Sequence, residues 1–419
     1  MQTPSEPLLS TESADPVTFA EIEEARQRLH GVIATSPCAY SELFSQRLGC
    51  KLFLKLENLL LTGSFKERGA ANKLLQLTDG EKTKGIIAAS AGNHAQAVAY
   101  HAGRLGISAK IVMPEGTPLV KIVRTKNFGG EIVLHGANFD EAHTHAVELM
   151  HEEGRVFIHP FDDPAIIAGQ GTLGLEILEQ NPYFDCVVVP IGGGGLAAGM
   201  AVAIKETNPR IRVIGVEAEV LPSMKTSIEA GKIIELPPAT TLCDGIAVRK
   251  VGGRAFATLS RYIDEIVTVS EEEVASAILE LLEQEKTVAE GAGATPLAAL
   301  LAGRISDIAG KKVCAVVSGG NIDVNIIARI IERGLVANGR MCRLDLQITD
   351  VPGSLAELLT VIGASRSNVL EIYHNRTFAE GSPLGMTNVE LKLETRGEDH
   401  IQRLRATLEE RGYRILDRF

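Results

Sequence analysis

The feature that most constrains the fold is a regular alternation of short apolar segments with helix-favouring segments. In a first run the apolar segments span residues 85–90, 109–114, 131–135 and 155–159. In a second run they span residues 186–190, 211–217, 265–269 and 312–317. Strand and helix alternate in this way in parallel sheets, because each crossover between parallel strands needs a long connection. The sequence therefore predicts an α/β fold with two parallel-sheet subdomains.

The uncharged segment 186–204 is long enough to suggest a membrane span. Pro190 and four consecutive glycines interrupt it, which disfavours a continuous helix. We expect a buried strand, a turn and a buried helix that starts after the glycines, and no membrane partner.

Composition narrows the classes of partner. The chain has 419 residues, a net charge of −11, 4% aromatic residues and no Trp. Nucleic-acid partners require a basic surface and aromatic stacking platforms, and neither is visible in this sequence. We therefore expect no nucleic-acid partner.

The cysteines and the N-terminal residues bear on the compartment. Six scattered cysteines form no C-x-x-C pair, so we expect reduced, mostly buried thiols and a cytoplasmic protein. Residues 1–16 are polar and acidic without a basic start, which indicates a disordered tail rather than a signal peptide. A capping-box pattern at residues 18–21 then predicts a helix to about residue 30.

Glycine and polar residues at 337–340 suggest a domain boundary. Beyond it we expect strands at 341–348, 369–375, 386–395 and 413–416, with helices at 354–364 and 398–411. This βαββαβ order is the ferredoxin-like pattern. The predicted domains are 17–336, with a smaller subdomain of about 67–157 inserted in a larger one, and an α+β module at 340–419.

The segment 61–70, LTGSFKERGA, places one lysine between an aromatic residue and a turn. We expect Gly63 and Ser64 to form a turn with a helix N-cap, so that Lys66 falls in the first helical turn. There the helix dipole, Arg68 and partial burial would lower the pKa of the amine, as Schiff-base chemistry requires. A solvated lysine is the alternative for this segment taken alone.

A glycine-rich turn at 191–199 lies between an apolar strand and an apolar helix. Its backbone could wrap closely around a phosphate, and no Walker lysine follows it. The rival interpretation is an NAD-dependent dehydrogenase, because Gly192, Gly194 and Ala197 fit a relaxed dinucleotide fingerprint and Glu217 ends the next strand.

Three further segments are candidates for the same site. Residues 90–94 would present helix N-terminal amides to a carboxylate, and residues 318–321 end a strand, although each could be an ordinary turn. Glu290 could point into a cleft or cap the following helix. His135, His143, His145 and His151 have no metal-binding spacing, so we expect no metal.

Taken together, the segments 64–66, 90–94, 192–196 and 318–321 resemble, in order and spacing, those of the fold-type II pyridoxal-phosphate enzymes, which are tryptophan synthase β-like. The resemblance covers residues 17–335, and its details look most like the threonine ammonia-lyases (threonine dehydratases). The module from residue 340 resembles an ACT domain.

The resemblance implies the following roles. Lys66 forms the internal aldimine with pyridoxal 5′-phosphate and moves the proton at the substrate's Cα. Phe65 and Gly245 flank the cofactor ring, Asn93 binds its 3′ oxygen, and Ser318 faces its nitrogen. Glu290 is counted with these cofactor-binding residues. The phosphate is held by Gly192, Gly193, Gly194, Gly195 and Leu196. The substrate carboxylate is received by Ser90, Ala91, Gly92, Asn93 and His94.

A neutral hydroxyl at the ring nitrogen would favour loss of a β-hydroxyl over transamination. Racemases of this family usually carry a serine where this chain has Ala91, which favours elimination. The resemblance thus implies conversion of L-threonine to 2-oxobutanoate and ammonia, and of L-serine to pyruvate. The alternatives are a serine or threo-3-hydroxyaspartate dehydratase, a racemase of the same fold, or an amino-acid sensor without catalysis.

The ACT-like module implies control by a branched-chain amino acid such as isoleucine or valine, as in isoleucine biosynthesis. Pro352, Gly353 and Asn368 match its ligand-binding loop. Such sites lie between two copies, so a homodimer or homotetramer is implied.

Overall fold

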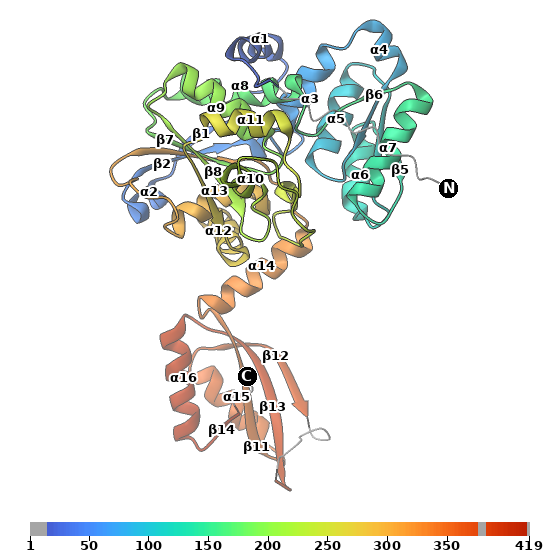
Figure 1. The fold of residues 1–419 in the computed structure, drawn as a ribbon. Helices are drawn as coiled ribbons and strands as arrows, with labels where there is room; N and C mark the ends of the chain where they lie inside the picture. Colours follow the sequence, from blue (N-terminus) through green and yellow to red (C-terminus); the bar gives the residue numbers. More distant parts are fainter. Residues whose placement is uncertain (1–14, 376–382, 417–419) are drawn as a thin grey trace. The chain divides into compact units, whose positions relative to one another are not determined.

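The computed structural model describes residues 15–375 and 383–416 (Figure 1). All but two residues of the predicted N-terminal tail therefore lie outside the described residues. The chain divides into two compact units, Met1–Asp323 and Val324–Phe419. The division falls before the helix at residue 324, whereas the sequence placed the boundary after that helix.

The first unit contains a six-stranded sheet in the order β1-β2-β10-β7-β8-β9, called the large sheet. Its strands are β1 (Cys38–Tyr40), β2 (Lys51–Leu56), β7 (Cys186–Pro190), β8 (Arg212–Ala218), β9 (Glu265–Val269) and β10 (Lys312–Val317). All neighbours pair in parallel except β1, which is antiparallel to β2. The sequence pattern did not indicate β1 or the pairing of β2 with β10.

The second sheet of this unit, called the small sheet, has the order β5-β4-β3-β6 and is entirely parallel. Its strands are β3 (Ile86–Ala89), β4 (Ala109–Met113), β5 (Glu131–Leu134) and β6 (Val156–Phe157). Two separate sheets, one entirely parallel and one parallel except for β1, confirm the predicted fold class.

Helices cover both sheets. They are α1 (Phe19–Leu29), α2 (Glu42–Leu48), α3 (Lys66–Leu75), α4 (Asp79–Lys84), α5 (Asn93–Arg104), α6 (Leu119–Asn127), α7 (Phe139–Glu153), α8 (Pro164–Gln180), α9 (Gly195–Thr207), α10 (Ser223–Ala230), α11 (Gly253–Tyr262), α12 (Glu271–Gln284) and α13 (Gly291–Leu301), with short 3-10 helices η1 (Glu57–Leu59) and η2 (Asp244–Ile246). The capping box of α1, between Thr18 and Glu21, is confirmed. One core joins α1, α8, α9 and α11 to the large sheet, and a second joins α3 and α5 to the small sheet.

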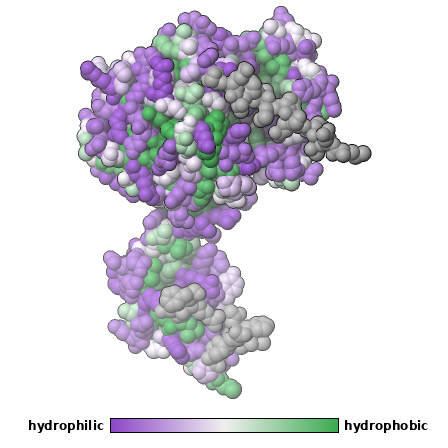
Figure 2. All heavy atoms as spheres, viewed as in Figure 1, coloured by the Kyte–Doolittle hydropathy of each residue, from purple (hydrophilic) through white to green (hydrophobic). Residues whose placement is uncertain are grey.

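The uncharged segment 186–204 forms β7, a turn and the first part of α9, as expected. The helix starts at Gly195, the last of the four glycines, rather than after them. Among the described residues no helix is both long and apolar enough to cross a membrane. Polar residues cover most of the face seen in Figure 2, with apolar residues visible in smaller areas between them.

The second unit comprises α14 (Val324–Ala337), β11 (Met341–Thr349), α15 (Ser354–Ala364), β12 (Asn368–Asn375), β13 (Met386–Glu394), α16 (Glu398–Glu410) and β14 (Arg414–Ile415). The antiparallel sheet has the order β12-β13-β11-β14. This is the ferredoxin-like arrangement that the sequence predicted. Its core includes Leu344, Leu346 and Leu391, which are almost completely buried.

All six cysteines are free, and four of them are buried. The expectation of mostly buried thiols is thus confirmed.

Candidate active site

A cavity of about 800 Å³ in the first unit brings the predicted segments together. Its lining comes from the carboxyl end of β3 in the small sheet and from the ends of β7 and β10 in the large sheet, where parallel sheets commonly bind ligands. The candidate residues that border it are Phe65, Lys66, Ser90, Ala91, Gly92, Asn93, His94, Gly192, Gly193, Gly194, Gly195, Leu196, Gly245, Glu290 and Ser318.

Lys66 is the first residue of α3, and its Nζ donates a 2.7 Å hydrogen bond to the backbone oxygen of Pro160. Burial lowers the pKa of Lys66 to about 8, against the opposing effect of Glu290. An amine with this pKa is substantially neutral near pH 8, as a nucleophile must be.

Two expectations about this turn were wrong. Phe65, not Ser64, occupies the N-cap position, and no side chain caps the helix. Arg68 does not lower the pKa of Lys66, because its guanidinium binds Glu57 and Glu176 and burial is the cause.

The turn before Lys66 is attached to the end of β10. The backbone N–H of Phe65 donates to the oxygen of Ser318 at 3.0 Å, and Ser64 forms an isolated bridge with Gly319. Gly63 has φ +77°, and a Cβ there would lie 2.6 Å from Oδ1 of Asn321. Only glycine fits both the backbone angle and this approach.

Three amide and carboxylate side chains at the cavity form a chain of hydrogen bonds. Nδ2 of Asn93 donates to Oε1 of Glu290 at 2.6 Å, and Nδ2 of Asn321 donates to Oδ1 of Asn93 at 2.7 Å. Glu290 stands at the N-cap position of α13 but makes no capping hydrogen bond, so its side chain faces the cavity. Burial, and then the nearby Asp244, raise the pKa of Glu290 to about 7.

The glycine turn packs closely against Phe161 because it lacks side chains. A Cβ at Gly193 would lie 2.3 Å from the ring of Phe161, and one at Gly195 would lie 2.5 Å from the Phe161 oxygen. Gly194 has φ +95°, and α9 begins without a side-chain cap. Its first backbone amides are therefore available to an anion such as a phosphate.

Residues 90–94 form the turn between β3 and α5, and α5 also begins without a side-chain cap. Nε2 of His94 lies 2.9 Å from the oxygen of Ile158, to which a neutral ring donates. Burial, with the positive charge of Lys66, lowers the pKa of His94 to about 3. His94 is thus a neutral ring held by the backbone, while the α5 amides remain for a carboxylate.

Three polar contacts at the cavity join elements of the two sheets, and no sequence motif marked them. Lys121 of α6 donates to Asp244 at 2.8 Å, and Arg124 donates to Asn321 at 2.7 Å. Arg249 donates to Asp140 of α7 at 2.9 Å. In the sequence these residues stand out only as single charged side chains, which are common on any protein surface.

Glu217 does not border the cavity. Its carboxylate accepts the backbone N–H groups of Met224 and Lys225 at 2.8 and 2.9 Å. Burial raises the pKa of Glu217 to about 7. The acid that the dinucleotide interpretation required is therefore engaged in holding the start of α10.

His135, His143, His145 and His151 do not border this cavity, although Asn138, Phe139 and Asp140 do. The rings of His135 and His145 stack with centroids 3.9 Å apart. In residues 15–375 and 383–416, no cluster of three or more His, Cys, Asp or Glu side chains could hold a metal ion.

The candidate effector residues belong to the second unit. Gly353 has φ +99° and is the N-cap of α15, with no side-chain cap. Asn368 begins β12, and its Nδ2 donates to Glu394 at 3.3 Å. Pro352 precedes Gly353 in the turn.

Comparisons with known proteins agree with this geometry. The family model described as "Pyridoxal-phosphate dependent enzyme" matches residues 29–319. The chain is 49% identical to an L-threonine ammonia-lyase of Thermotoga maritima, over 95% of this chain and 99% of that protein.

Two solved structures are also similar. Threonine deaminase isoform 2 from Solanum lycopersicum matches with a TM-score of 0.73 and 37% identity, over 78% of this chain and 98% of that chain. Maize serine racemase matches with a TM-score of 0.72 and 34% identity, over 78% and 99%. With a cavity that gathers a buried lysine, a glycine turn and two uncapped helix ends, the chain belongs to the family of pyridoxal-phosphate dependent enzymes.

Proposed function

We propose that this chain is an L-threonine ammonia-lyase that converts L-threonine to 2-oxobutanoate and ammonia by β-elimination, and L-serine to pyruvate. The observation that carries the proposal is the single cavity bordered by Lys66, the glycine turn and Ser318. The 49% identity to a relative named L-threonine ammonia-lyase, over nearly the full length of both chains, supports the choice of substrate.

The residues of the cavity fit pyridoxal phosphate. A phosphate suits the amides of Gly192, Gly193, Gly194, Gly195 and Leu196, where a Cβ at Gly193 would collide with Phe161. A buried amine with a lowered pKa suits a carbonyl carbon, so Lys66 would hold the cofactor covalently. When bound, pyridoxal phosphate supplies the electron sink that stabilises negative charge at the substrate's Cα.

We assign the other cofactor contacts to residues around the same cavity. Phe65 and Gly245 would flank the ring, with Ser318 at its nitrogen and Asn93 at its 3′ oxygen. Glu290 would act through Asn93, because its carboxyl group accepts the 2.6 Å hydrogen bond that orients this amide. A neutral serine hydroxyl, unlike a carboxylate, does not hold a full positive charge on the ring nitrogen.

The proton at the substrate's Cα would pass to Nζ of Lys66. The lowered pKa lets this amine exist as a base near neutral pH, and the ammonium so formed would then give its proton to the β-hydroxyl, which leaves as water. The amides of residues 90–94 would bind and orient the substrate carboxylate at the start of α5.

A racemase of the same fold is the second candidate, since maize serine racemase is 34% identical. It would need a base on the face of the substrate opposite Lys66. Ala91 borders the cavity and offers no such group. The choice of elimination over racemisation rests on this residue.

The test is steady-state formation of keto acids from L-threonine, L-serine and threo-3-hydroxyaspartate by the purified chain loaded with pyridoxal phosphate. We expect the highest kcat/KM with L-threonine. A higher value for hydroxyaspartate would overturn the substrate, and absence of keto acid from all three would leave the sensor interpretation.

We further propose that the second unit is an ACT-like regulatory module that binds a branched-chain amino acid such as isoleucine or valine. The uncapped start of α15 at Gly353, with Pro352 before it, would receive the carboxylate. Asn368, at the start of β12, would hold the amino group through its amide oxygen, since its nitrogen donates to Glu394. A site shared by two copies would make the enzyme a homodimer or homotetramer.

Six free thiols are consistent with a reducing compartment. We propose that the enzyme works in the cytoplasm.

A further inference from the structure

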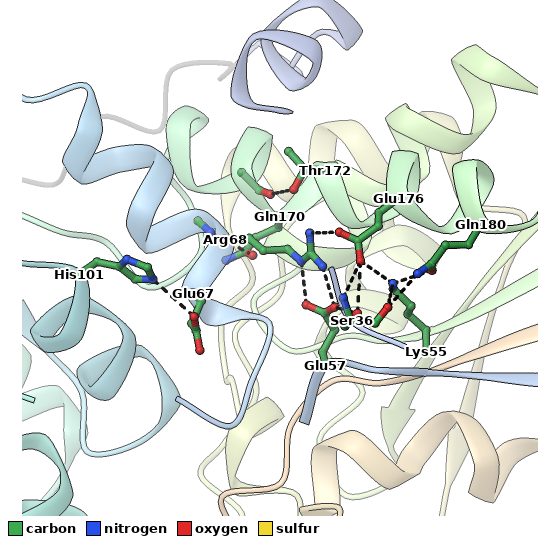
Figure 3. A network of polar contacts seen from close by, with 12 residues as sticks. Ser36, Lys55, Glu57, Glu67, Arg68, His101, Gln170, Thr172, Glu176 and Gln180 are labelled. Atoms are coloured by element: carbon green, nitrogen blue, oxygen red, sulfur yellow. Dashed lines mark hydrogen bonds and ion pairs between the residues drawn. The ribbon is translucent and has the colours of Figure 1, made fainter. Parts of the chain in front are cut away.

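A buried network of four charged side chains lies beside the first turn of α3 (Figure 3). It consists of Lys55 at the end of β2, Glu57 in η1, Arg68 on α3 and Glu176 on α8. Lys55, Glu57 and Arg68 are at most 3% exposed. None of the four borders the cavity, so none can touch a substrate there.

Arg68 is the centre of this network. Its Nε and Nη2 donate to the two oxygens of Glu57 at 2.7 and 2.8 Å, and its Nη1 donates to Glu176 at 2.9 Å. A planar guanidinium holds two carboxylates through a rigid fork of donors, whereas a lysine ammonium is a compact point charge without that fork. Burial by itself would lower the pKa of Arg68, but Glu57 and then Glu176 raise it, so the cation is permanent.

Glu176 is fixed from its other side as well. Lys55 donates to its Oε1 at 2.5 Å, and also to the side chain of Gln180 and the backbone of Ser36. Burial would raise the pKa of Glu176, but Arg68 and Lys55 hold it below its ordinary value. The carboxylate of Glu176, which binds Arg68, therefore stays charged at neutral pH.

Successive residues of an α-helix point about 100° apart, so Lys66, Glu67 and Arg68 face three directions. Lys66 faces the cavity, and Arg68 faces η1 and α8. Glu67 accepts a hydrogen bond from the backbone N–H of Thr62. Its other carboxylate oxygen lies 3.6 Å from Nε2 of His101 on α5. The short contacts of Arg68 thus attach this turn to the elements of the large sheet.

Stability alone does not explain so costly an arrangement. Removing four charges from water is expensive, and well-packed apolar residues often stabilise a core equally well. The first turn of α3 lacks a side-chain cap. Backbone contacts of Ser64 and Phe65 hold the residues before it to the end of β10. The side chain of Arg68 holds the helix itself to η1 and α8.

We propose that Arg68, through Glu57 and Glu176, is a positioning residue that fixes the amine of Lys66 relative to the glycine turn and Ser318. The inference rests on the proposed function, because it assumes that Lys66 holds the cofactor and moves the Cα proton. Arg68 touches neither cofactor nor substrate and acts only by placing Lys66.

The experiment compares Arg68→Lys with a control on the same helix, Lys73→Met, in the full-length enzyme loaded with pyridoxal phosphate. Lys73 forms a 2.6 Å ion pair with Asp163, near the other end of α3. Kinetics on L-threonine, thermal unfolding, and the pH response of the visible absorption band of the lysine-bound cofactor are measured for each protein.

We expect Arg68→Lys to lower kcat by about 10- to 100-fold while KM changes by less than about threefold, as for a misplaced catalytic group. The pH at which the visible band changes should also shift, because the surroundings of Nζ change. Lys73→Met should keep the wild-type kcat and the wild-type pH response of the visible band. This should hold even if its unfolding temperature falls as far as that of Arg68→Lys.

Equal effects of the two substitutions, or a loss of kcat without a spectral shift, would overturn the inference. If Arg68→Lys does not fold, Glu57→Gln replaces it in the test. Glutamine keeps one of the two oxygens that accept from Arg68, so this variant should fold and still show the lowered kcat and the spectral shift. Glu57→Gln with normal kcat and normal spectral response, but a lower unfolding temperature, would make the network purely structural.

Failure of the proposed function can be distinguished from failure of the positioning role. Borohydride reduction of the wild-type holoenzyme, followed by peptide mass spectrometry, reports whether Lys66 carries the cofactor. A wild-type protein without cofactor on Lys66 refutes the function itself. A labelled Lys66 with unaffected Arg68 and Glu57 variants refutes only the positioning role.

Discussion

The amine of Lys66 donates to the backbone oxygen of Pro160 in the segment that leads from the small sheet back to α8. This carbonyl satisfies one donor of the amine but carries no charge to hold it protonated. Burial therefore prevails over the carboxylate of Glu290, and the pKa of Lys66 falls to about 8.

Replacing this amine should abolish turnover without abolishing cofactor binding. Lys66→Ala should still bind pyridoxal phosphate through the glycine turn but lower kcat by at least about 1000-fold, because both nucleophile and base are lost. Keto-acid formation and exchange of the Cα proton with deuterium, followed by NMR, are the measurements. Lys73→Ala is the control, and exchange near the wild-type rate in Lys66→Ala would remove Lys66 as the base.

Glu290 should make the stability of the cofactor-free chain depend on pH. Its pKa of about 7 in the folded chain lies above the value of about 4.3 for an unfolded glutamate. The stabilisation is complete below about pH 4 and is lost as the pH rises through 7, a difference of about 4 kcal/mol. Urea unfolding of Glu290→Gln should show a smaller loss between pH 5 and 8 than wild type. The raised pKa of Glu217 contributes equally to both proteins. An unchanged loss would contradict the assignment.

A methyl group in the glycine turn should weaken cofactor binding. At Gly193 it would lie 2.3 Å from the Phe161 ring, so the backbone must move. Overpacking of this kind costs about 1–3 kcal/mol, which is roughly 5- to 150-fold in Kd. Spectroscopic titration of Gly193→Ala with pyridoxal phosphate measures it. Gly80→Ala is the matched control, because a Cβ at Gly80 meets nothing within 4 Å. Equal Kd values in both variants would show that the turn does not hold the cofactor.

Ala91 should leave elimination as the dominant reaction. With L-serine, the wild-type enzyme should produce pyruvate and, by chiral chromatography, less than about a tenth as much D-serine, because no base faces Lys66. Ala91→Ser should raise the share of D-serine. D-serine equal to pyruvate in the wild type would favour the racemase.

The proposed effector site predicts a response that can be removed separately from activity. Isoleucine or valine should shift the apparent affinity for L-threonine by about fivefold or more. Gly353→Asp should abolish the shift by placing a like charge at the start of α15, while Gly353→Asn, equally affected by the φ of +99°, should keep it. A chain cut after Asp323, where the two units divide, should lose the response and its oligomeric state. Retention of both would exclude this module as the regulator.

Local patterns predicted most of the secondary structure. The bounds of β7, β9, β10 and α15 agree with the expected ranges, because each segment has a clear apolar pattern and a marked end. β1 escaped prediction because three residues carry no period. Ser64 was assigned a cap that it does not form, since the position of that turn depends on Ser318 and Gly319, far away in the chain.

In the candidate site, too, local motifs could be predicted and contacts between distant residues could not. Its glycines and Lys66 could be found from spacing, whereas the partners of Arg68 and Glu290 could not. Arg68 binds a residue of η1 and one of α8, and Glu290 accepts from Asn93 at the start of α5. Such partners depend on tertiary packing, which a single sequence does not display.

The central place of β10 in the large sheet has a consequence for biosynthesis. β10 pairs with β2 on one side and β7 on the other, although it is the last of these strands to be translated. Until residues 312–317 leave the ribosome, β2 and β7 each keep an open edge, and the turn of Lys66 lacks Ser318. Open edges invite wrong pairing, and non-local pairing is slow. The nascent chain is therefore most exposed to aggregation just before β10 emerges, and its active site is among the last parts to form.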